Sequence, residues 1–461
     1  MSKQSEASSR LRSFIAPALL KAGIQLPKPQ LEEITSLVGG SMVGVGRYFH
    51  NPEHVIHVGS GGDALSVVAA FFHDLVYLQV DQGIGLNVAR QIGPFLDEHE
   101  GQLSLRADID LKQAPFCQAV LGVFGFHPGD RLAALGGQNE FLSALTAASL
   151  LAPFATLAQI VEVAACIEAT IPFRAKSARG ESAAQRLHTR LGRLNTEMKL
   201  GLSADQLKAA VRRAVRMANQ DVSDFGGESA ARFLKNTWEL VPESNPMLRE
   251  RGSISVAGYR QALQRMESFF SNLDPATVFQ EFDGEPGAAA LEKMRANAGA
   301  RVEEARIYFR MKLTGLALLE ALSTTLGDGL ALPLLLGELS NLGSLESHAA
   351  VLPGGGARLS GGEAETRILQ LLESDTQDEQ GLKSSPLTAY LLRSVGFAEL
   401  GRIWPLTEKF FEQKATAREV LESFPANTVQ QVGRAISSLL QEEAERVQRF
   451  VDSVARLDRA G

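Results

Sequence analysis

Apolar residues recur at three- and four-residue spacing through almost the whole chain, the pattern of helices that bury one face. The alternating pattern that marks strands between tight turns is rare. These two observations predict an all-α fold. The segments with the clearest helical spacing are 11–20, 65–78, 141–151, 160–171, 207–217 and 259–270.

Two stretches break the helical pattern and suggest domain edges. Residues 172–182 are polar and weakly patterned, and residues 353–362 are dense in glycine, which cannot hold regular structure cheaply. A chain of 461 residues is long enough for two or three domains. We therefore expect a first helical domain, a second of unassigned role and a C-terminal helical region, at 1–180, 181–352 and 363–461.

The last segment, 428–457, has the spacing of one long helix whose apolar face is interrupted at Glu443 and Arg446. Such a face could form a coiled-coil seam with one polar layer and join two copies of the chain in a homodimer. An amphipathic helix packed on its own domain is the alternative.

Composition and charge exclude several classes of partner. The net charge of −7 argues against binding DNA or RNA polymers, which select basic surfaces. The most apolar stretch, 313–339, is interrupted by charged residues, glycine and proline, and it falls short of the ~20 apolar residues of a membrane span. We expect this stretch to be buried core. With no secretory signal visible and two cysteines in apolar surroundings, a cytoplasmic protein that does not bind a membrane is expected.

Histidines concentrate in one part of the chain. Imidazole is the commonest neutral metal ligand, and an adjacent carboxylate adds a negative oxygen donor. A carboxylate within an apolar segment needs a positive partner, which a bound cation would provide. Four of the eight histidines and one aspartate therefore form a candidate metal site: His50, His54, His57, His73 and Asp74.

Helix-start signals place these side chains. Asn51 before Pro52 predicts a helix start, with His54 in the first turn. A glycine-rich turn at 59–62 would end that helix, and Asp63 is a plausible cap for the next one. The turn would let the first helix fold back, so that His54 reaches the fork between His73 and Asp74.

Two local motifs carry a resemblance to a known family. The stretch from Tyr48 to His54 (Tyr-Phe-His-Asn-Pro-Glu-His) is similar to the His-Asn-x-x-His signature of cyclic-nucleotide phosphodiesterases. The stretch from Phe72 to Tyr77 resembles the Phe-His-Asp-x-x-Tyr motif of small predicted bacterial HD phosphohydrolases. Together they resemble the HD superfamily of metal-dependent phosphohydrolases over roughly residues 47–175. The resemblance implies that the metal ligands are His54, His73 and Asp74, and that His50 donates a proton to the leaving group.

The superfamily has a fourth ligand, a downstream aspartate. The best match is Asp130, because Asp-Arg-Leu at 130–132 looks like an element of the stringent-response nucleotide hydrolases. Asp108 and Asp110 are weaker candidates, and Glu140 could substitute. The chain departs from the family by lacking an acidic residue just after the second motif and by a shorter interval between the two motifs than in the cyclic-nucleotide enzymes.

Such a site would bind Mn, Mg, Fe or Zn and lower the pKa of a bound water towards neutrality. Asp74 could orient that water, while His50 protonates the departing oxygen. Arg47, Arg131 and Arg174 are candidates to bind the charge of a nucleotide or other small phosphoester. The sequence thus predicts a metal-dependent phosphohydrolase acting on a small phosphorylated substrate.

Two other functions are compatible with the same residues. A di-iron oxygenase of HD type would need a second metal, for which His57 or His127 could serve. A sensor or scaffold would bind a ligand without turnover.

The polar run 219–224 could line a cleft, although a helix terminus explains it equally well.

Overall fold

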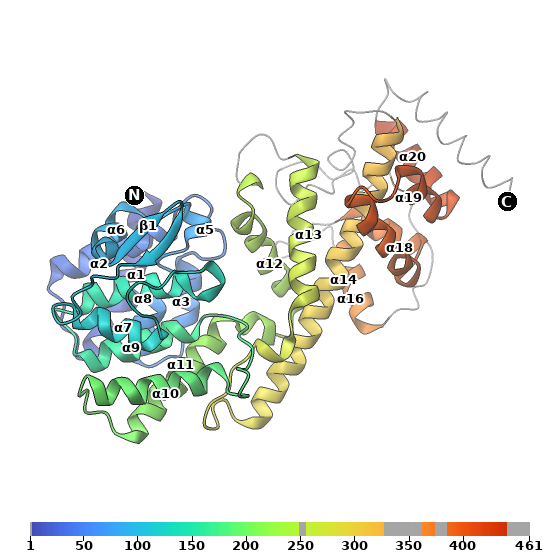
Figure 1. Cartoon of the computed structure of the whole chain (residues 1–461). Coiled ribbons are helices and arrows are strands. Elements are labelled where there is room, and N and C mark those ends of the chain that lie inside the picture. The colour runs from blue at the N-terminus through green and yellow to red at the C-terminus, as the bar shows by residue number, and fades with distance from the viewer. Residues whose placement is uncertain (1, 249–254, 327–351, 353–361, 374–384, 440–461) are drawn as a thin grey trace. The chain divides into compact units, whose positions relative to one another are not determined.

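The computed structural model describes residues 2–248, 255–326, 352, 362–373 and 385–439 (Figure 1). Helices account for 71% of the model, and the described residues contain 19 α-helices with a single two-stranded sheet. The predicted all-α fold is therefore confirmed. In the described parts of the chain, no helix combines the length and apolarity needed to cross a bilayer.

The chain divides into two compact units. Unit 1 comprises Met1–Gly227 and Asp274–Ala298, and unit 2 comprises Glu228–Leu273 and Gly299–Gly461. The boundary expected near residue 180 lies inside unit 1, because the two helices after it pack on the earlier ones. The second expected boundary, at 353–362, lies almost entirely outside the described residues.

Unit 1 is a cluster of helices with one short antiparallel hairpin, in which Leu96 pairs with Leu105. Its elements are α1 (Lys3–Lys21), α2 (Lys28–Met42), α3 (Pro52–Gly59), α4 (Ala64–Phe72), α5 (Leu78–Asp81), α6 (Leu86–Ile92), β1 (Leu96–His99), β2 (Gln102–Leu105), α7 (Pro115–Phe124), α8 (Gln138–Leu151), α9 (Leu157–Ala169), α10 (Ala183–Glu197) and α11 (Ala204–Asp221).

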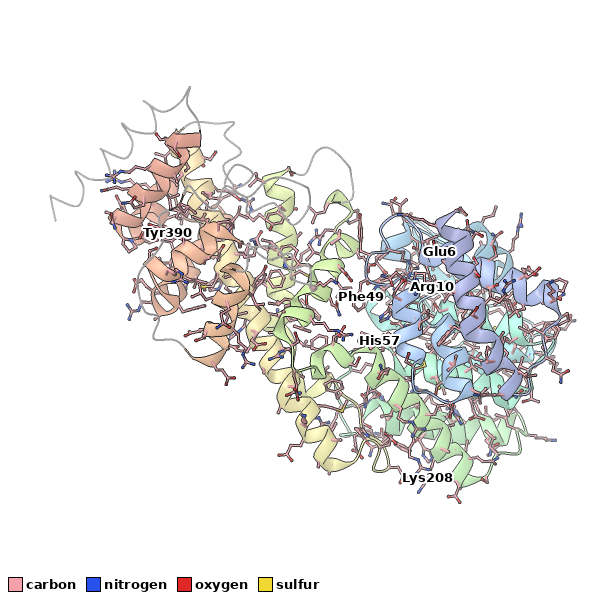
Figure 2. The ribbon with its side chains drawn as sticks, turned by 180° about the vertical axis from the view of Figure 1, so that it is seen from behind. Glu6, Arg10, Phe49, His57, Lys208 and Tyr390 are labelled. Carbon is pink, nitrogen blue, oxygen red and sulfur yellow. The ribbon has the colours of Figure 1, made fainter. Side chains whose placement is uncertain are left out.

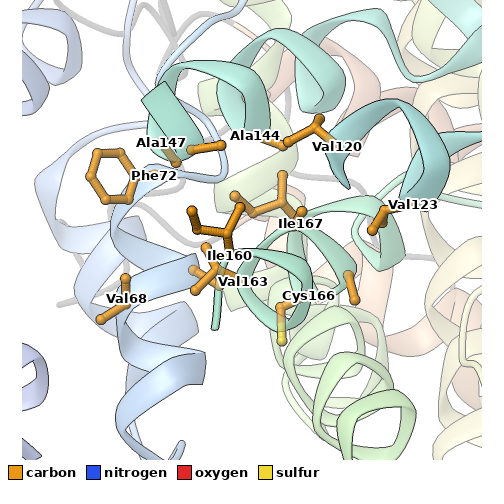
Figure 3. Close-up of a cluster of buried hydrophobic side chains, with 14 of the residues drawn as sticks. Val68, Phe72, Val120, Val123, Ala144, Ala147, Ile160, Val163, Cys166 and Ile167 are labelled. Atoms are coloured by element: carbon orange, nitrogen blue, oxygen red, sulfur yellow. The ribbon is translucent and has the colours of Figure 1, made fainter. Parts of the chain in front are cut away.

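Helix α9 forms the centre of unit 1. It packs against α4, α7, α8, α10 and α11. Ile160, Val163 and Ile167 recur at three- and four-residue spacing and are fully or almost fully buried. Figure 3 shows them beside Phe72 of α4 and Val120 of α7. Burial of each such side chain contributes about 1.5–3 kcal/mol, so this core fixes the helices around it.

The helix starts near the histidines lie where the sequence predicts them. The Asn51 side chain accepts from the backbone N–H groups of Glu53 and His54 and so caps α3. Asp63 accepts from Ser66 N and caps α4. Helix α3 then passes close to α1 at Gly59, where an added Cβ would lie 2.5 Å from the ring of Phe14.

The predicted helix at 65–78 is interrupted. Helix α4 ends at Phe72, α5 begins at Leu78, and His73 and Asp74 lie in the turn between them. The His73 ring lies with Nδ1 2.7 Å from the carbonyl oxygen of Ala70. A continuing helix would offer that oxygen to the backbone N–H of Asp74. The histidine side chain therefore replaces a helical hydrogen bond where the helix stops.

All the regular secondary structure in the described residues of unit 2 is helical. Helix α14 (Ala288–Leu326) begins in unit 1 and continues in unit 2. The apolar stretch 313–339 was expected to be buried core; its residues from Leu313 to Leu326 include a buried face, and residues 327–339 lie outside the described residues. The predicted C-terminal helix is described only as far as Leu439. Val429, Val432 and Ile436 of its apolar face are buried, and the rest of the proposed dimer seam lies outside the described residues. The other helices are α12 (Ala230–Ser244), α13 (Val256–Asn272), α16 (Glu363–Glu373), α17 (Pro386–Ser394), α18 (Phe397–Phe411), α19 (Ala417–Ser423) and α20 (Ala426–Leu439).

Candidate metal centre

Four side chains of unit 1 converge on one point, and their ligand atoms all lie within 4.8 Å of one another. His54 comes from the first turn of α3, and Asp221 is the last residue of α11. His73 and Asp74 come from the turn after α4. The structure thus brings together three of the predicted ligands and adds Asp221 as the fourth.

The spacing of these atoms fits a single cation. Ligands roughly 2.0–2.2 Å from one ion lie about 2.8–3.6 Å from their neighbours in tetrahedral or octahedral geometry. The four histidine–aspartate separations lie in or close to that range, and all four atoms lie within 4.8 Å of one another. These separations are 3.3 Å from His54 Nε2 to Asp74 Oδ2, 3.1 Å from His54 Nε2 to Asp221 Oδ1, 2.7 Å from His73 Nε2 to Asp74 Oδ2 and 3.5 Å from His73 Nε2 to Asp221 Oδ1.

Three of the four ligand atoms are buried polar atoms without a hydrogen-bond partner among the described residues. They are His54 Nε2, His73 Nε2 and Asp74 Oδ2. The separations are short, but the ring nitrogens are not aimed at the carboxylate oxygens as hydrogen bonds require. Leaving such atoms unsatisfied costs about 1–3 kcal/mol each, and more for charged groups. A cation at the common point would satisfy all of them.

The contact of His73 with the backbone assigns its tautomer. A carbonyl oxygen can only accept, so His73 Nδ1 carries the proton that it donates to Ala70. In the neutral ring, Nε2 then has its lone pair free to face the other ligands. This arrangement, a backbone carbonyl behind the ligating histidine, is the usual support for a metal-bound imidazole.

The same carboxylates control the protonation of the two histidines when no ion is bound. Burial alone would lower the pKa of His54, but Asp221 and Asp74 raise it to about 9. Burial also opposes the charged form of His73, yet Asp74 and Asp221 raise its pKa well above the usual value. The metal-free centre therefore holds protons on its imidazoles, and a bound metal would displace them.

The two carboxylates shift in the opposite direction. Burial would raise the pKa of Asp221, but His54 and His73 lower it to about 2. For Asp74, His73 and then His50 outweigh burial and hold the pKa well below its usual value. Both aspartates are therefore ionised at neutral pH, as metal ligands must be.

Arg47 supports the centre from inside the protein. Its side chain is 0% exposed and pairs with Asp81, with 2.6 Å between Nη2 and Oδ2. Its Nη1 donates to the carbonyl oxygen of Asp74 at 2.9 Å. We expected Arg47 to bind substrate, but its buried guanidinium instead holds the turn that carries the His73–Asp74 pair.

Asp130, the expected fourth ligand, lies outside the group. Its side chain is 43% exposed, and its Oδ2 accepts from the backbone N–H of His127 at 2.8 Å. The carboxylate thus closes its own turn, and Asp221 is the fourth member of the candidate group in its place. Arg131, the next residue, is exposed and forms an isolated bridge with Ser104.

The remaining candidates from the sequence also have other partners. Arg174, expected to bind substrate, pairs with the buried Glu168. Asp108 pairs with Arg106, and Asp110 accepts from the backbone of Lys112. None of these side chains belongs to the group of four in the described part of the chain.

His50 lies beside the centre without being part of it. Its ring centroid is 5.4 Å from that of His54 and 4.8 Å from that of Tyr77. The influence of its charge on Asp74 places it within electrostatic reach of the ligands. The proton-donor role that the resemblance implies for His50 stays a prediction, and the structure places its ring adjacent to the four side chains and outside their group.

Glu140 near the start of α8 is a further titratable group close to the centre. Burial raises its pKa to about 7, and the charges of Asp74 and Asp221 act in the same direction. The sequence suggested Glu140 as a substitute ligand, but it is not one of the four. It is instead a carboxyl group that gains or loses a proton near neutrality beside the centre.

Sequence reasoning did not identify Asp221 as a ligand. The one signal was the polar run 219–224 at the end of an otherwise amphipathic helix. Such a run could line a cleft, but it is equally typical of a helix terminus.

Comparisons of the chain with protein-family models, with curated proteins and with solved structures gave no match.

Proposed function

We propose that the protein is a metal-dependent hydrolase of small phosphoesters, with its active site at the centre formed by His54, His73, Asp74 and Asp221. The observation that carries the proposal is the convergence of these four ligands, three of whose facing atoms are buried without another partner. The local resemblance to HD phosphohydrolases supports the choice of reaction.

The donor set indicates the class of metal. Two imidazole nitrogens and two carboxylate oxygens suit Mn²⁺, Fe²⁺ or Zn²⁺. Mg²⁺ prefers oxygen ligands and keeps several waters, so it fits this set less well. A bound ion of this kind would act as a Lewis acid on the phosphoryl oxygen and activate water for attack.

The residues of the chain have separate tasks in this proposal. His73 and Asp74 are held from behind, by Ala70 O and by Arg47 respectively, so their ligand atoms are fixed before substrate arrives. His50 lies outside the group and donates the proton to the leaving oxygen. Glu140 provides a nearby carboxyl group that can accept a proton near pH 7.

A small substrate fits the charge of the molecule better than a polymer. The chain carries a net charge of −7, which opposes the approach of a long polyanion. Neither His57 nor His127 lies among the grouped ligand atoms of the described residues, so no observation favours a second metal from them and the oxygenase chemistry that would use it.

The test is elemental analysis of the purified protein, followed by assays of phosphate release. The substrates are nucleotides, cyclic nucleotides, phosphomonoesters and single-stranded oligonucleotides, each with Mn²⁺, Fe²⁺, Zn²⁺ and Mg²⁺ in turn. We expect about one transition-metal ion per chain and turnover of a small phosphoester that is lost in Asp74→Ala. Metal-loaded protein that hydrolyses nothing, or cleaves oligonucleotides alone, would contradict the proposal.

A further inference from the structure

His57, the remaining histidine of the cluster, contacts residues at the end of the helix that carries Asp221 (Figure 2 labels His57). His57 Nε2 lies 2.9 Å from Ser223 Oγ and 3.3 Å from Gln220 Nε2. The Gln220 amide also donates to the carbonyl oxygen of His57 at 3.3 Å. Two residues that flank Asp221 in sequence therefore bind the same residue of α3.

Two contacts thus join the same pair of elements. His54 and His57 both belong to α3, while Gln220 and Asp221 end α11 and Ser223 follows it. The first contact is between the two ligands, with His54 Nε2 3.1 Å from Asp221 Oδ1. The second, which we name the latch, consists of His57, Gln220 and Ser223. Because the latch joins α3 to the end of α11, it sets the distance between those two ligands.

A ligand at a helix end needs such support. Helix termini fray, and a metal ligand must be held within about 0.5 Å of its working position. Neighbouring Asn219 anchors the other side of the same turn, because it donates to and accepts from the backbone of Gln280 at 2.9 and 2.8 Å. The end of α11 is therefore held on both sides of Asp221.

The hydrogen-bond directions in the latch are consistent. His57 Nε2 forms one in-plane hydrogen bond, and the Ser223 hydroxyl at 2.9 Å is its nearer partner, as donor or acceptor according to the tautomer, while the Gln220 amide donates to the carbonyl oxygen of His57. Either tautomer leaves His57 Nε2 engaged with the residue that follows α11, so His57 stays outside the group of four although it lies one turn from His54.

We propose that His57, Gln220 and Ser223 are positioning residues that hold the Asp221 carboxylate in the metal centre. This inference rests on the metal centre of the proposed function, but not on the reaction assigned to it. A merely structural role would make the latch contribute to folding and leave the metal geometry unchanged.

The test uses Co²⁺ as the probe, because its affinity and its visible spectrum report ligand number and geometry. For His57→Ala we expect the Kd to rise about 10–100-fold, the usual loss when an outer-shell support is removed. Its spectrum should move toward that of Asp221→Ala. Ser223→Ala loses one neutral hydrogen bond and should raise the Kd roughly 2–10-fold.

Two controls separate positioning from folding. Ser149→Ala removes a hydrogen bond to Gln91 between α8 and α6, so it matches Ser223→Ala away from the centre and should leave the Kd unchanged. His57→Gln places an acceptor oxygen near the lost nitrogen and should restore the Kd to within about threefold of wild type. It also keeps the test decisive if the alanine variant does not fold.

The outcomes are distinguishable. A His57→Ala protein with wild-type Kd and spectrum but a lower unfolding midpoint would overturn the positioning role. Co²⁺-loaded wild type that hydrolyses no phosphoester would contradict the proposed function and leave this inference intact. Wild type that takes up no Co²⁺ would contradict both.

Discussion

Unit 1 buries two clusters of ionisable side chains, and they are built in different ways. In one, Glu168 is 2% exposed and lies 2.5 Å from both Arg174 and Arg190. Arg190 donates in addition to the carbonyl oxygen of Val123. Anion and cations are joined directly, and Arg174 Nε is the one atom of these three side chains that is buried without a hydrogen-bond partner among the described residues.

The other cluster is the candidate metal centre, whose histidine and aspartate atoms pair at 2.7–3.5 Å, while three of them have no hydrogen-bond partner of proper geometry among the described residues. Both clusters pay the desolvation cost of buried charge. Only the first is compensated by well-directed hydrogen bonds to its own side chains. Buried charge alone therefore does not indicate a ligand site, whereas buried nitrogen and oxygen atoms that converge on one point without hydrogen bonds do.

The largest expected effect removes the metal itself. A His73→Ala/Asp74→Ala double variant should fall from about one bound ion per chain to almost none, because two of the four ligands are lost. Glu168→Gln, the matched change in the other cluster, should keep its full metal content. Elemental analysis after dialysis checks both. Full metal in the double variant would show that the two clusters do not differ as described.

The next effect concerns chemistry beside the metal centre. His50→Asn should cut turnover by roughly 10²–10⁴ while metal content stays at the wild-type level, because His50 lies outside the four ligands. Steady-state kinetics with elemental analysis on the same preparation measures both. Loss of the metal in this variant would make His50 a ligand.

The cluster of Glu168, Arg174 and Arg190 should contribute to the stability of the fold and not to metal binding. Glu168→Gln leaves Arg174 and Arg190 without their shared carboxylate, and removing one partner of a buried ion pair costs about 3–5 kcal/mol. We expect the free energy of unfolding in urea to fall by that amount, with the metal Kd unchanged. A Kd that weakens as much as His57→Ala would indicate that the clusters are coupled.

The pH dependence of stability should differ between metal-free and metal-loaded protein. Burial lowers the pKa of His54, but Asp221 and Asp74 raise it from 6.5 to about 9. Because the folded pKa is raised, the stabilisation is full below about pH 6.5 and is lost as pH rises through about 9. Metal-free protein should therefore lose stability over this interval, while metal affinity rises.

Urea unfolding at pH 6.5 and pH 9, with and without a chelator, tests this prediction. Only the chelated protein should lose the contribution of the charged histidines, since the metal-loaded protein already holds them neutral. Equal losses with and without the chelator would contradict the assignment of the histidines as ligands.

Local signals in the sequence predicted much of this architecture. The side chains of Asn51 and Asp63 accept hydrogen bonds from backbone N–H groups no more than three residues away. These two helix starts are therefore specified by the nearby sequence. The interruption after Phe72 was not predicted, because the apolar spacing continues through it. It depends on the His73 ring binding the Ala70 carbonyl, which spacing alone does not reveal.

The metal centre was predictable only where its residues are close in sequence. His54, His73 and Asp74 were found from adjacent motifs, whereas Asp221 arrives from a helix far along the chain. Its approach depends on the packing of α11 against α3 and α9, which no local pattern encodes. The exposed Asp130 fitted a family motif, but its own turn satisfies it.

Asp221 and Asp130 are the competing candidates for the fourth ligand, and their effects on metal affinity distinguish them. Isothermal titration of Zn²⁺ or Mn²⁺ into metal-free wild type, Asp221→Ala and Asp130→Ala compares them under the same conditions. We predict a Kd at least about 100-fold weaker for Asp221→Ala, because a charged ligand is lost, and an unchanged Kd for Asp130→Ala. An unchanged affinity in Asp221→Ala together with a large loss in Asp130→Ala would contradict the metal centre described above.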